Sequence, residues 1–127
     1  MFEDKAGPIT SFEWGRFVIG GVIHSEEGNG VGKDIFVMAD RVQPWSARKG
    51  HRLKPSMVDC VLGKHVDILV IGNGVNGAIK ITKKTRKAIK AAGIAELVVE
   101  KTPQACATYN RLAREGRRVA LLAHGTC

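Results

Sequence analysis

Apolar positions in the first third of the chain follow the short alternation of β-strands. Bulky side chains recur through residues 9–24 and are interrupted by glycines, which predicts short strands. Gly20 and Gly21 lie between two apolar runs, as in a two-residue hairpin turn. A further strand is predicted at residues 35–40 and another at 41–45. No helical period is visible in this part, so the pattern predicts an N-terminal β-meander.

From residue 55 onward, continuous apolar runs alternate with amphipathic stripes of helical period. Thr82 and Thr102 each precede such a stripe, so each is predicted as a helix N-cap. The alternation predicts one α/β domain, residues 1–127, with a mostly parallel central sheet flanked by helices. The predicted helices span 55–62, 83–92 and 102–115; the predicted buried strands span 66–71, 94–100 and 119–123, with a short strand at 79–81 that we expect to pair antiparallel.

The composition indicates an ordinary globular protein. The chain has 127 residues, which suits one domain with one core. Its three cysteines are widely spaced and form no C-x-x-C pair, which favours a reducing compartment. The acidic start of the sequence lacks the apolar region of a signal peptide, and no apolar run approaches the roughly 20 residues of a membrane span. We therefore expect a cytoplasmic protein with no membrane partner.

Charge is spread unevenly along the chain. The net charge is +8, but residues 1–40 hold seven acidic and three basic side chains, whereas residues 41–94 hold two acidic and twelve basic ones. A basic middle third can attract anions or acidic partners, and it can equally be a solvated lysine-rich surface. Nucleic acid is not expected as a partner, because the chain lacks helix-turn-helix and zinc-finger patterns and the interleaved aromatics of single-strand binders.

The segment after the 66–71 strand has the spacing G-x-G-x-x-G, with glycines at 72, 74 and 77. In a dinucleotide-binding fold the third glycine opens a helix whose N–H groups hold the pyrophosphate. Here A-I-K-I-T separates Gly77 from the helix cap at Thr82, and no G-K-[ST] of a P-loop is present. The spacing therefore leaves two interpretations: a structural turn, which we favour, or an anion site.

Two further groups of side chains are candidates for chemistry. Trp45, Arg48 and His51 recur every third residue in a basic loop, so one turn could direct all three to the same side. His124 precedes Cys127 by three positions, and such a pair can form a thiolate nucleophile or half of a metal site. No partner that would orient the histidine is identifiable, and no second pair has ligand spacing. We therefore expect no metal, no cofactor and no catalytic residue.

Several sequence segments together resemble one known family. They are S-F-x-x-G-R-x-V (Ser11 to Val18), P-W-x-x-R-x-x-H-x-L (Pro44 to Leu53), I-G-x-G-x-x-G (Ile71 to Gly77), T-P-x-A-x-x-x-Y-N-x-L (Thr102 to Leu112) and the final G-R-R-V-A-x-L-x-H-x-T-C (Gly116 to Cys127). In order and spacing they resemble the Mth938-like domain family. The resemblance implies a three-layer α/β domain with a mixed central sheet. It implies no established activity, although relatives include a mitochondrial complex I assembly factor and an adipogenesis-associated cytoplasmic protein.

The leading interpretation is a cytoplasmic binding or assembly-type domain without catalytic activity, whose partner is another protein. The alternative is an anion- or nucleotide-binding protein that uses the Gly72–Gly77 loop with the basic 41–54 loop. An enzyme with Cys127 as nucleophile is a third hypothesis. If strands 66–71 and 119–123 are parallel, the glycine loop and the end of the sequence meet at one sheet edge. The residues of the candidate pocket are then Trp45, Arg48, His51, Gly72, Asn73, Gly74, Gly77, His124, Thr126 and Cys127.

Overall fold

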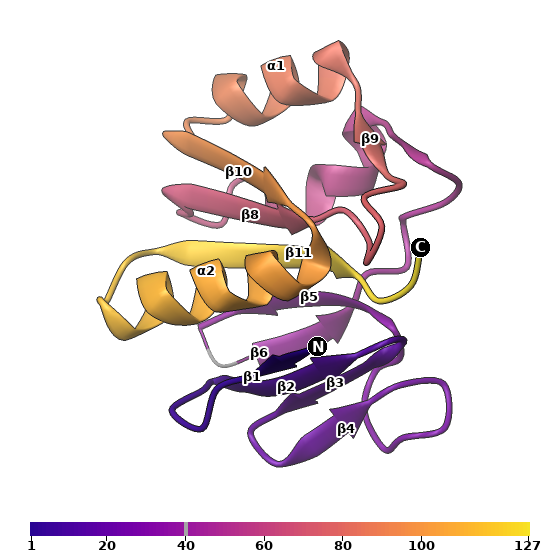
Figure 1. The fold of residues 1–127 in the computed structure, drawn as a ribbon. Helices are drawn as coiled ribbons and strands as arrows, with labels where there is room; N and C mark the ends of the chain where they lie inside the picture. Colours follow the sequence, from indigo (N-terminus) through magenta and orange to yellow (C-terminus); the bar gives the residue numbers. More distant parts are fainter. Residues whose placement is uncertain (40) are drawn as a thin grey trace.

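A five-stranded mixed sheet forms the centre of the protein in the computed structural model, which describes residues 1–39 and 41–127 (Figure 1). Asp40, the last residue of the predicted 35–40 strand, lies outside the described residues. The strand order is β10-β8-β11-β5-β6. These strands are β5 (Asp34–Met38), β6 (Arg41–Pro44), β8 (Ile68–Gly72), β10 (Glu96–Glu100) and β11 (Val119–His124).

The pairings in this sheet divide evenly between the two directions. Strand β8 is parallel to both β10 and β11, whereas β5 is antiparallel to both β11 and β6. The mixed sheet is therefore confirmed, but the expectation of a mostly parallel one is not. Every residue of β8 and β11 is buried, as their continuous apolar sequences predict. The prediction that β10 is buried was wrong: it lies at the sheet edge and pairs only with β8, so its residues stay partly exposed.

The N-terminal meander is a separate four-stranded antiparallel sheet. Its strands are β1 (Phe2–Glu3), β2 (Ile9–Glu13), β3 (Arg16–Ile19) and β4 (Val22–His24). Gly20 and Gly21 form the predicted hairpin turn between β3 and β4, with φ values of 57° and 80°. Two-residue hairpin turns of this kind need positive φ at both positions, which glycine adopts without strain.

Three helices are described: the 3₁₀-helix η1 (Pro55–Val61), α1 (Lys83–Ala91) and α2 (Thr102–Arg114). Thr82 caps α1 as predicted, because its side chain accepts a hydrogen bond from the Thr85 N–H at 3.2 Å. The same prediction for Thr102 was wrong. The N-cap of α2 is Lys101, and the Thr102 hydroxyl forms hydrogen bonds outside the helix instead.

A short parallel pair separates the glycine loop from α1. Strand β9 (Lys80–Ile81) pairs with β7 (Arg52–Leu53), so the short strand exists as predicted, but its pairing is parallel rather than antiparallel. The Lys80 N–H donates to the His51 carbonyl at 2.8 Å. This pairing explains why no helix begins at the glycine loop, since the chain first crosses to β7.

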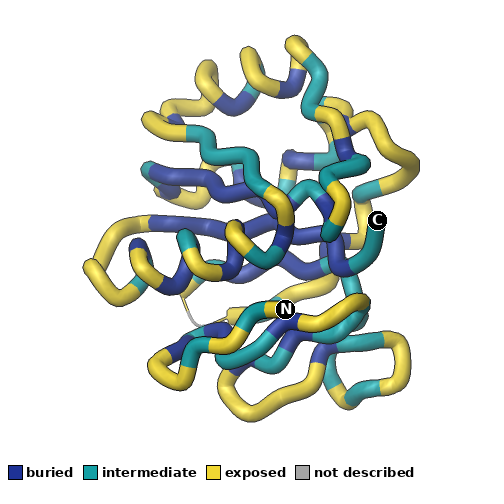
Figure 2. The backbone as a smooth tube through the Cα atoms, viewed as in Figure 1, coloured by how far each residue is buried: buried dark blue, intermediate teal, exposed yellow. Residues whose placement is uncertain are grey.

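Packed elements cover both faces of the central sheet (Figures 1 and 2). On one face, α2 and the N-terminal sheet enclose a core that includes Phe12, Phe17 and Tyr109. On the other, η1, α1 and the β7–β9 pair enclose a second core that includes Trp45 and Ile89. Figure 2 shows the buried residues concentrated along the central strands. No helix in the described part of the chain is long and apolar enough to cross a membrane.

Candidate functional site

The glycine loop (Gly72 to Gly77) and the HGTC segment (His124 to Cys127) meet at one edge of the central sheet. Strands β8 and β11 are parallel, and Gly72 is the register partner of Ala123. The residues that follow each strand therefore emerge side by side. The Val75 N–H donates to the Thr126 carbonyl at 2.9 Å, and the Asn76 N–H donates to the Cys127 carbonyl at 3.0 Å. The glycine loop thus holds the HGTC segment by its backbone.

The backbone N–H groups of this loop are used within the protein. Each N–H from residue 73 to residue 79 donates to a protein acceptor, among them the Glu100 carbonyl for Asn73 and the Cys127 carbonyl for Ala78. A phosphate cradle needs several free N–H groups that converge on one point. The hydrogen bonding of this loop therefore weighs against the anion-binding alternative and favours the structural turn.

Close approach of two backbones explains the glycine at position 74. A Cβ atom there would lie 2.4 Å from the Cys127 carbonyl carbon, and the φ of Gly74 is +105°. A buried threonine, Thr102, supports the same contact: its hydroxyl accepts from the Gly74 N–H at 3.0 Å and donates to the His124 carbonyl at 2.7 Å. One side chain from the start of α2 thereby joins the loop to the HGTC segment.

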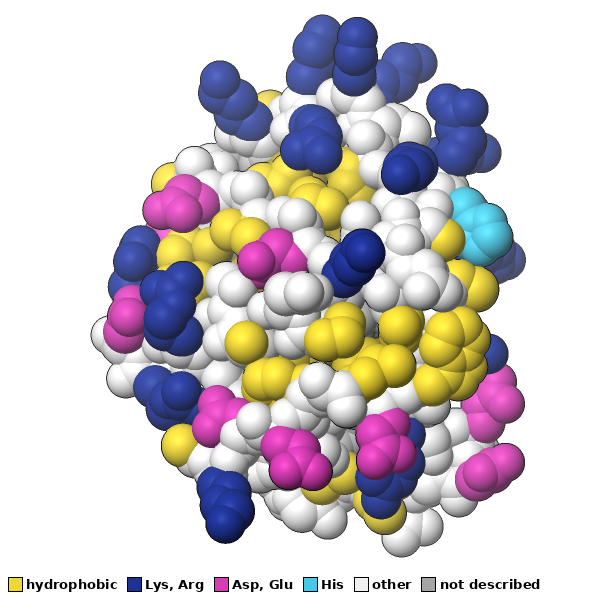
Figure 3. Space-filling view, viewed as in Figure 1, with side chains coloured by type: hydrophobic (Ala, Val, Ile, Leu, Met, Phe, Trp, Pro, Cys, Tyr) yellow, Lys and Arg dark blue, Asp and Glu magenta, His cyan; other side chains and the backbone are white. Residues whose placement is uncertain are grey.

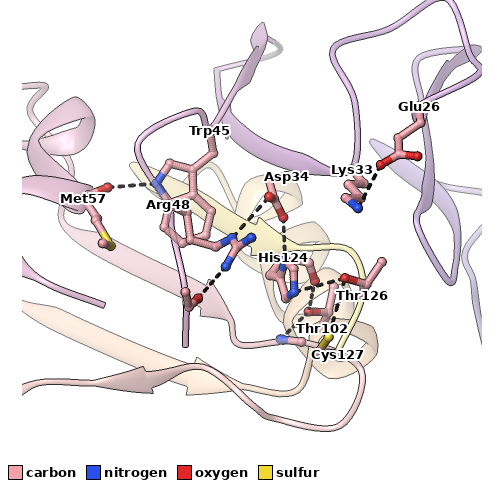
Figure 4. A network of polar contacts seen from close by, with 12 residues as sticks. Glu26, Lys33, Asp34, Trp45, Arg48, Met57, Thr102, His124, Thr126 and Cys127 are labelled. Atoms are coloured by element: carbon pink, nitrogen blue, oxygen red, sulfur yellow. Dashed lines mark hydrogen bonds and ion pairs between the residues drawn. The ribbon is translucent and has the colours of Figure 1, made fainter. Parts of the chain in front are cut away.

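A chain of polar side chains runs from the basic loop to the HGTC segment (Figure 4). The Arg48 Nε donates to Asp34 Oδ2 at 3.2 Å, and its Nη1 donates to the Gly50 carbonyl at 2.6 Å. Asp34 Oδ1 lies 2.6 Å from Nδ1 of His124, and Nε2 of the same ring lies 3.1 Å from the Thr126 hydroxyl oxygen. The order Arg48, Asp34, His124, Thr126 is therefore continuous through hydrogen bonds.

Asp34 is ionised in this arrangement. Burial by itself would raise the pKa of its carboxyl group, but the hydrogen bond from His124 and the charge of Arg48 outweigh burial, so the pKa lies below its ordinary value of 3.8. An ionised carboxylate only accepts hydrogen bonds. The hydrogen on the contacting nitrogen must therefore belong to His124, which places a proton on Nδ1.

Cys127 lies at the end of this chain of contacts and meets it through Thr126 rather than through His124. Its sulfur is 3.9 Å from the Thr126 hydroxyl oxygen, and the hydrogen bond of His124 Nε2 goes to Thr126. All three cysteines are free, and burial raises the pKa of the Cys60 and Cys106 thiols. The histidine–cysteine pair of the sequence motif is thus a histidine–threonine pair in the structure. The described residues contain no group of three or more His, Cys, Asp or Glu side chains placed to hold a metal ion.

Two of the candidate residues lie apart from the place where the glycine loop, the HGTC segment and the polar side chains meet. Trp45 is 2% exposed, packs in the second core and donates its indole N–H to the Met57 carbonyl at 2.8 Å. His51 is exposed and meets the loop region only through its carbonyl, which accepts from Lys80. The structure brings together the others: Arg48, Gly72, Asn73, Gly74, Gly77, His124, Thr126 and Cys127.

An open groove of about 490 Å³ adjoins the HGTC segment. Thr126 lies in its lining together with Trp14, Arg16 and Lys33. The ammonium group of Lys33 pairs with Glu26 at 2.8 Å across the loop that follows β4. Since the Thr126 hydroxyl also contacts His124, it links the groove to the buried polar side chains behind it.

Sequence reasoning missed two residues of the site, Asp34 and Thr102. Asp34 is the cross-strand register partner of His124 in the antiparallel β5–β11 pair. Directly opposed residues have Cβ atoms about 4.5–5.5 Å apart, so a correct strand pairing would have identified the contact. Thr102 was noticed, but its helix-start position suggested a cap. Only the packing of α2 against the glycine loop reveals its other role.

Several solved structures share this fold. A conserved hypothetical protein from Pyrococcus horikoshii matches with a TM-score of 0.74 at 20% identity, over 94% of this chain and 98% of that one. A Bartonella henselae protein described as an outer membrane protein gives 0.77 at 21%, over 94% and 95%. A Mth938-like domain from Bordetella pertussis gives 0.67 at 18%, over 98% and 90%. These likenesses confirm the fold of the resemblance noted above.

A family model described as a protein of unknown function (DUF498/DUF598) matches residues 9–124. The match spans the strands from β2 to β11, all three described helices and the glycine loop. It also includes His124 and Asp34 but stops before Thr126. The chain belongs to the DUF498/DUF598 family of proteins of unknown function, with the fold of the Mth938-like domain.

Proposed function

We propose that this protein binds a partner protein through an apolar patch on its N-terminal sheet. The patch consists of Trp14 and Ile23, which are 54% and 38% exposed and line the same groove. Among the described residues, the other exposed large hydrophobic side chains are Met1 and Val22, and Val22 faces the opposite side of β4 from Ile23 because successive strand residues alternate. Exposed apolar side chains scattered over a surface need no explanation, but apolar side chains that share one groove are typical of interaction sites. This grouping is the observation on which the proposal depends.

The lining of the groove beside the patch resembles a small protein interface in its arrangement of apolar and charged side chains. Trp14 and Ile23 form part of its lining, and charged side chains surround them: Arg16, Glu26, Glu27 and Lys33. Protein interfaces combine an aromatic or aliphatic centre with a polar rim, and tryptophan is enriched among the residues that contribute most to affinity. Trp14 is therefore the expected anchor.

The distribution of charge on the protein indicates the kind of partner that we propose. Residues 1–40, which include the whole N-terminal sheet, the loop after it and β5, hold seven acidic and three basic side chains. The excess positive charge of the protein lies elsewhere, and Figure 3 shows Lys and Arg side chains gathered over α1 at the far end of the molecule. Complementary charge speeds encounter and orients the partner. The partner we propose is an extended segment of a basic protein, with a large apolar side chain next to Lys or Arg.

A cytoplasmic location and a role in assembling larger complexes are parts of the same proposal. Three free cysteines support a reducing compartment. The resemblance to assembly factors supports the assembly role, whereas the groove itself supports only the binding of a protein segment.

A peptide library displayed on phage and selected on the full chain tests the proposal. We expect enrichment of segments that combine an apolar residue with Lys or Arg. Replacing Trp14→Ser should weaken a selected peptide by roughly 30-fold or more, the effect of losing an interface anchor. Lys87→Ser, on exposed α1, is the matched control and should bind like the unmodified protein. Selected peptides that bind the Trp14→Ser variant equally well, or a library that yields none, would reject this function.

A further inference from the structure

We propose that Thr126 is the nucleophile of an acyl-transfer site that accepts small carboxylic esters in the groove, with His124 as its base and Asp34 as the residue that positions the base. This goes beyond the protein binding proposed above, although both use the same groove. No partner that could orient His124 is identifiable from the sequence alone. The structure supplies one in Asp34, 90 positions earlier in the chain.

The three side chains have the order that nucleophilic catalysis requires. The Asp34 carboxylate accepts a hydrogen bond from the N–H at His124 Nδ1, with 2.6 Å between the nitrogen and Oδ1. A neutral imidazole carries its hydrogen on only one ring nitrogen, so the lone pair of Nε2 remains available. That nitrogen lies 3.1 Å from Thr126 Oγ1, within reach of the hydroxyl proton. A hydroxyl, a base and a carboxylate that orients the base form the arrangement by which enzymes activate serine or threonine.

The backbone holds this arrangement from several sides. His124 ends β11 and is 3% exposed, opposite Asp34 in register. The Gly15 N–H donates to the Gly125 carbonyl at 2.7 Å, and the Val75 N–H donates to the Thr126 carbonyl at 2.9 Å. Two separate parts of the fold thus fix the peptide on which the hydroxyl is carried. Such support is what keeps a reactive group in its productive geometry.

Thr126 lies in the lining of a groove that is large enough for a small substrate. Thr126 is partly exposed in a groove of about 490 Å³, a volume in the range of small-molecule sites, roughly 300–1,000 Å³. Trp14 and Ile23 offer apolar surface to an acyl or aryl group. Arg16 brings positive charge to the same lining, where negative charge develops on the acyl oxygen, whereas the ammonium group of Lys33 is paired with Glu26. These features suit an ester with a short acyl chain.

The reaction balances without any co-reactant except water. In acylation, Thr126 Oγ1 forms a bond to the acyl carbon, the hydroxyl proton passes to His124 Nε2, and the bond to the leaving alcohol breaks as its oxygen takes that proton. In deacylation, a water oxygen attacks the acyl carbon of the threonine ester. The water proton passes to Nε2, the bond between the acyl carbon and Thr126 Oγ1 breaks as that oxygen takes the proton, and the free acid leaves. No group is oxidised or reduced.

The acetyl ester of p-nitrophenol, mixed with the full chain, tests this assignment. Release of nitrophenol gives the rate, and peptide mass spectrometry locates the acetyl group. We expect the acetyl group on Thr126. The rate should fall at least about tenfold in Thr126→Val, which keeps the shape of the side chain, and Thr126→Ser should restore it. Cys127→Ala removes the neighbouring thiol as an alternative nucleophile, and the acetyl group should still be found on Thr126.

The Asp34→Asn variant shows whether Asp34 positions His124 for ester cleavage or only stabilises the fold. We expect it to lower the maximal rate while the ester concentration at half-maximal rate stays the same. An acetyl group on Cys127 or on a surface lysine, or a Thr126→Val variant as fast as the unmodified protein, would overturn the proposal. The peptide binding proposed above is tested separately, because Asp34 is not part of the groove lining and Asp34→Asn should bind selected peptides normally whether or not the esterase activity exists.

Discussion

His124 and Asp34 are cross-strand partners whose side chains join β11 to β5 through a 2.6 Å contact between Nδ1 and Oδ1. The contact lies where the parallel and antiparallel halves of the central sheet meet, since β11 is parallel to β8 and antiparallel to β5. It also lies directly behind Thr126. One pair of side chains therefore contributes both to the stability of the sheet and to the chemistry of its edge.

Replacing Asp34→Asn should destabilise the protein by about 2 kcal/mol at neutral pH, because a charged hydrogen bond to a buried histidine is lost. The pKa of Asp34 is lowered in the folded protein, so its contribution is complete above the unfolded value, near 3.8, and is lost as the pH falls through the folded value. The difference in unfolding free energy between the two proteins should therefore shrink below about pH 4. Urea denaturation at several pH values measures it.

Asp59→Asn is the matched control for this measurement, because Asp59 is exposed on η1. It should change the unfolding free energy by no more than about 0.5 kcal/mol at any pH. An Asp34→Asn protein as stable as the original at neutral pH, or a difference that does not change with acid, would contradict the role assigned to Asp34.

Gly74→Ala should loosen the HGTC segment. A Cβ at this position meets the Cys127 backbone at 2.4 Å, so the segment has to move. Gly32→Ala is a close control: Gly32 has a φ of +109°, near the +105° of Gly74, but its Cβ would meet nothing within 4 Å. The control should lose only the strain of the backbone conformation, about 1–3 kcal/mol.

Hydrogen exchange at the Asn76 and Ala78 amides reports on the same substitution, because both donate to the Cys127 carbonyl. Their exchange should accelerate in Gly74→Ala and stay unchanged in Gly32→Ala. Equal losses of stability in the two variants, with both amides still protected, would show that the contact with the HGTC segment is unimportant.

Asn110→Leu should weaken the attachment of the N-terminal sheet to α2. The buried Asn110 side chain accepts from the Ile9 N–H at 2.9 Å and donates to the Ile9 carbonyl at 2.8 Å. Leucine leaves both backbone groups without a partner, which should cost about 2–4 kcal/mol in unfolding free energy. Arg111→Leu, on the exposed side of α2, should change it by about 0.5 kcal/mol or less. Thermal or urea unfolding measures these differences. Similar losses of unfolding free energy in both variants would show that the hydrogen bonds from Asn110 to Ile9 do not stabilise the packing of α2 on the N-terminal sheet.

Protonation of His24 should weaken the protein in mild acid. Its Nδ1 accepts from the Val31 N–H at 3.1 Å, its Nε2 is buried without a partner, and burial lowers the pKa of the ring below 6.5. The unfolded chain then binds the proton more readily, so stability should fall as the pH drops below about 6.5. His24→Gln should reduce that slope between about pH 7 and pH 5.5, whereas His51→Gln, at an exposed position, should keep it. Equal slopes in all three proteins would contradict this account.

The convergence of the glycine loop and the HGTC segment was predictable because it follows from sheet geometry. Two continuous apolar runs imply parallel buried strands, and the ends of parallel strands share an edge. The absence of a helix after Gly77 was also visible, since Ile79 and Ile81 alternate with Lys80. Both conclusions depend on the order of apolar and polar residues within one segment, which can be read directly from the sequence.

The contacts between distant segments were not predictable. Asp34 faces His124 only because β5 joins the sheet antiparallel to β11, and nothing in either strand specifies that neighbour. Thr102 matches the pattern of a helix cap, yet the packing of α2 directs its hydroxyl to Gly74 and His124. Trp45 lies in a loop of recognition-type residues, yet the second core buries it. In each case a tertiary contact overrides the local signal.

The tautomer of His124 shows whether Asp34 positions this ring so that it can activate Thr126. Nitrogen NMR of the full chain at about pH 8.5, well above the ordinary pKa of histidine, distinguishes a protonated ring nitrogen from an unprotonated one. We predict that Nδ1 carries the hydrogen, that Nε2 does not, and that Asp34→Asn removes this preference. A ring with its hydrogen on Nε2, or a preference that survives Asp34→Asn, would contradict both the positioning role of Asp34 and the activation of Thr126.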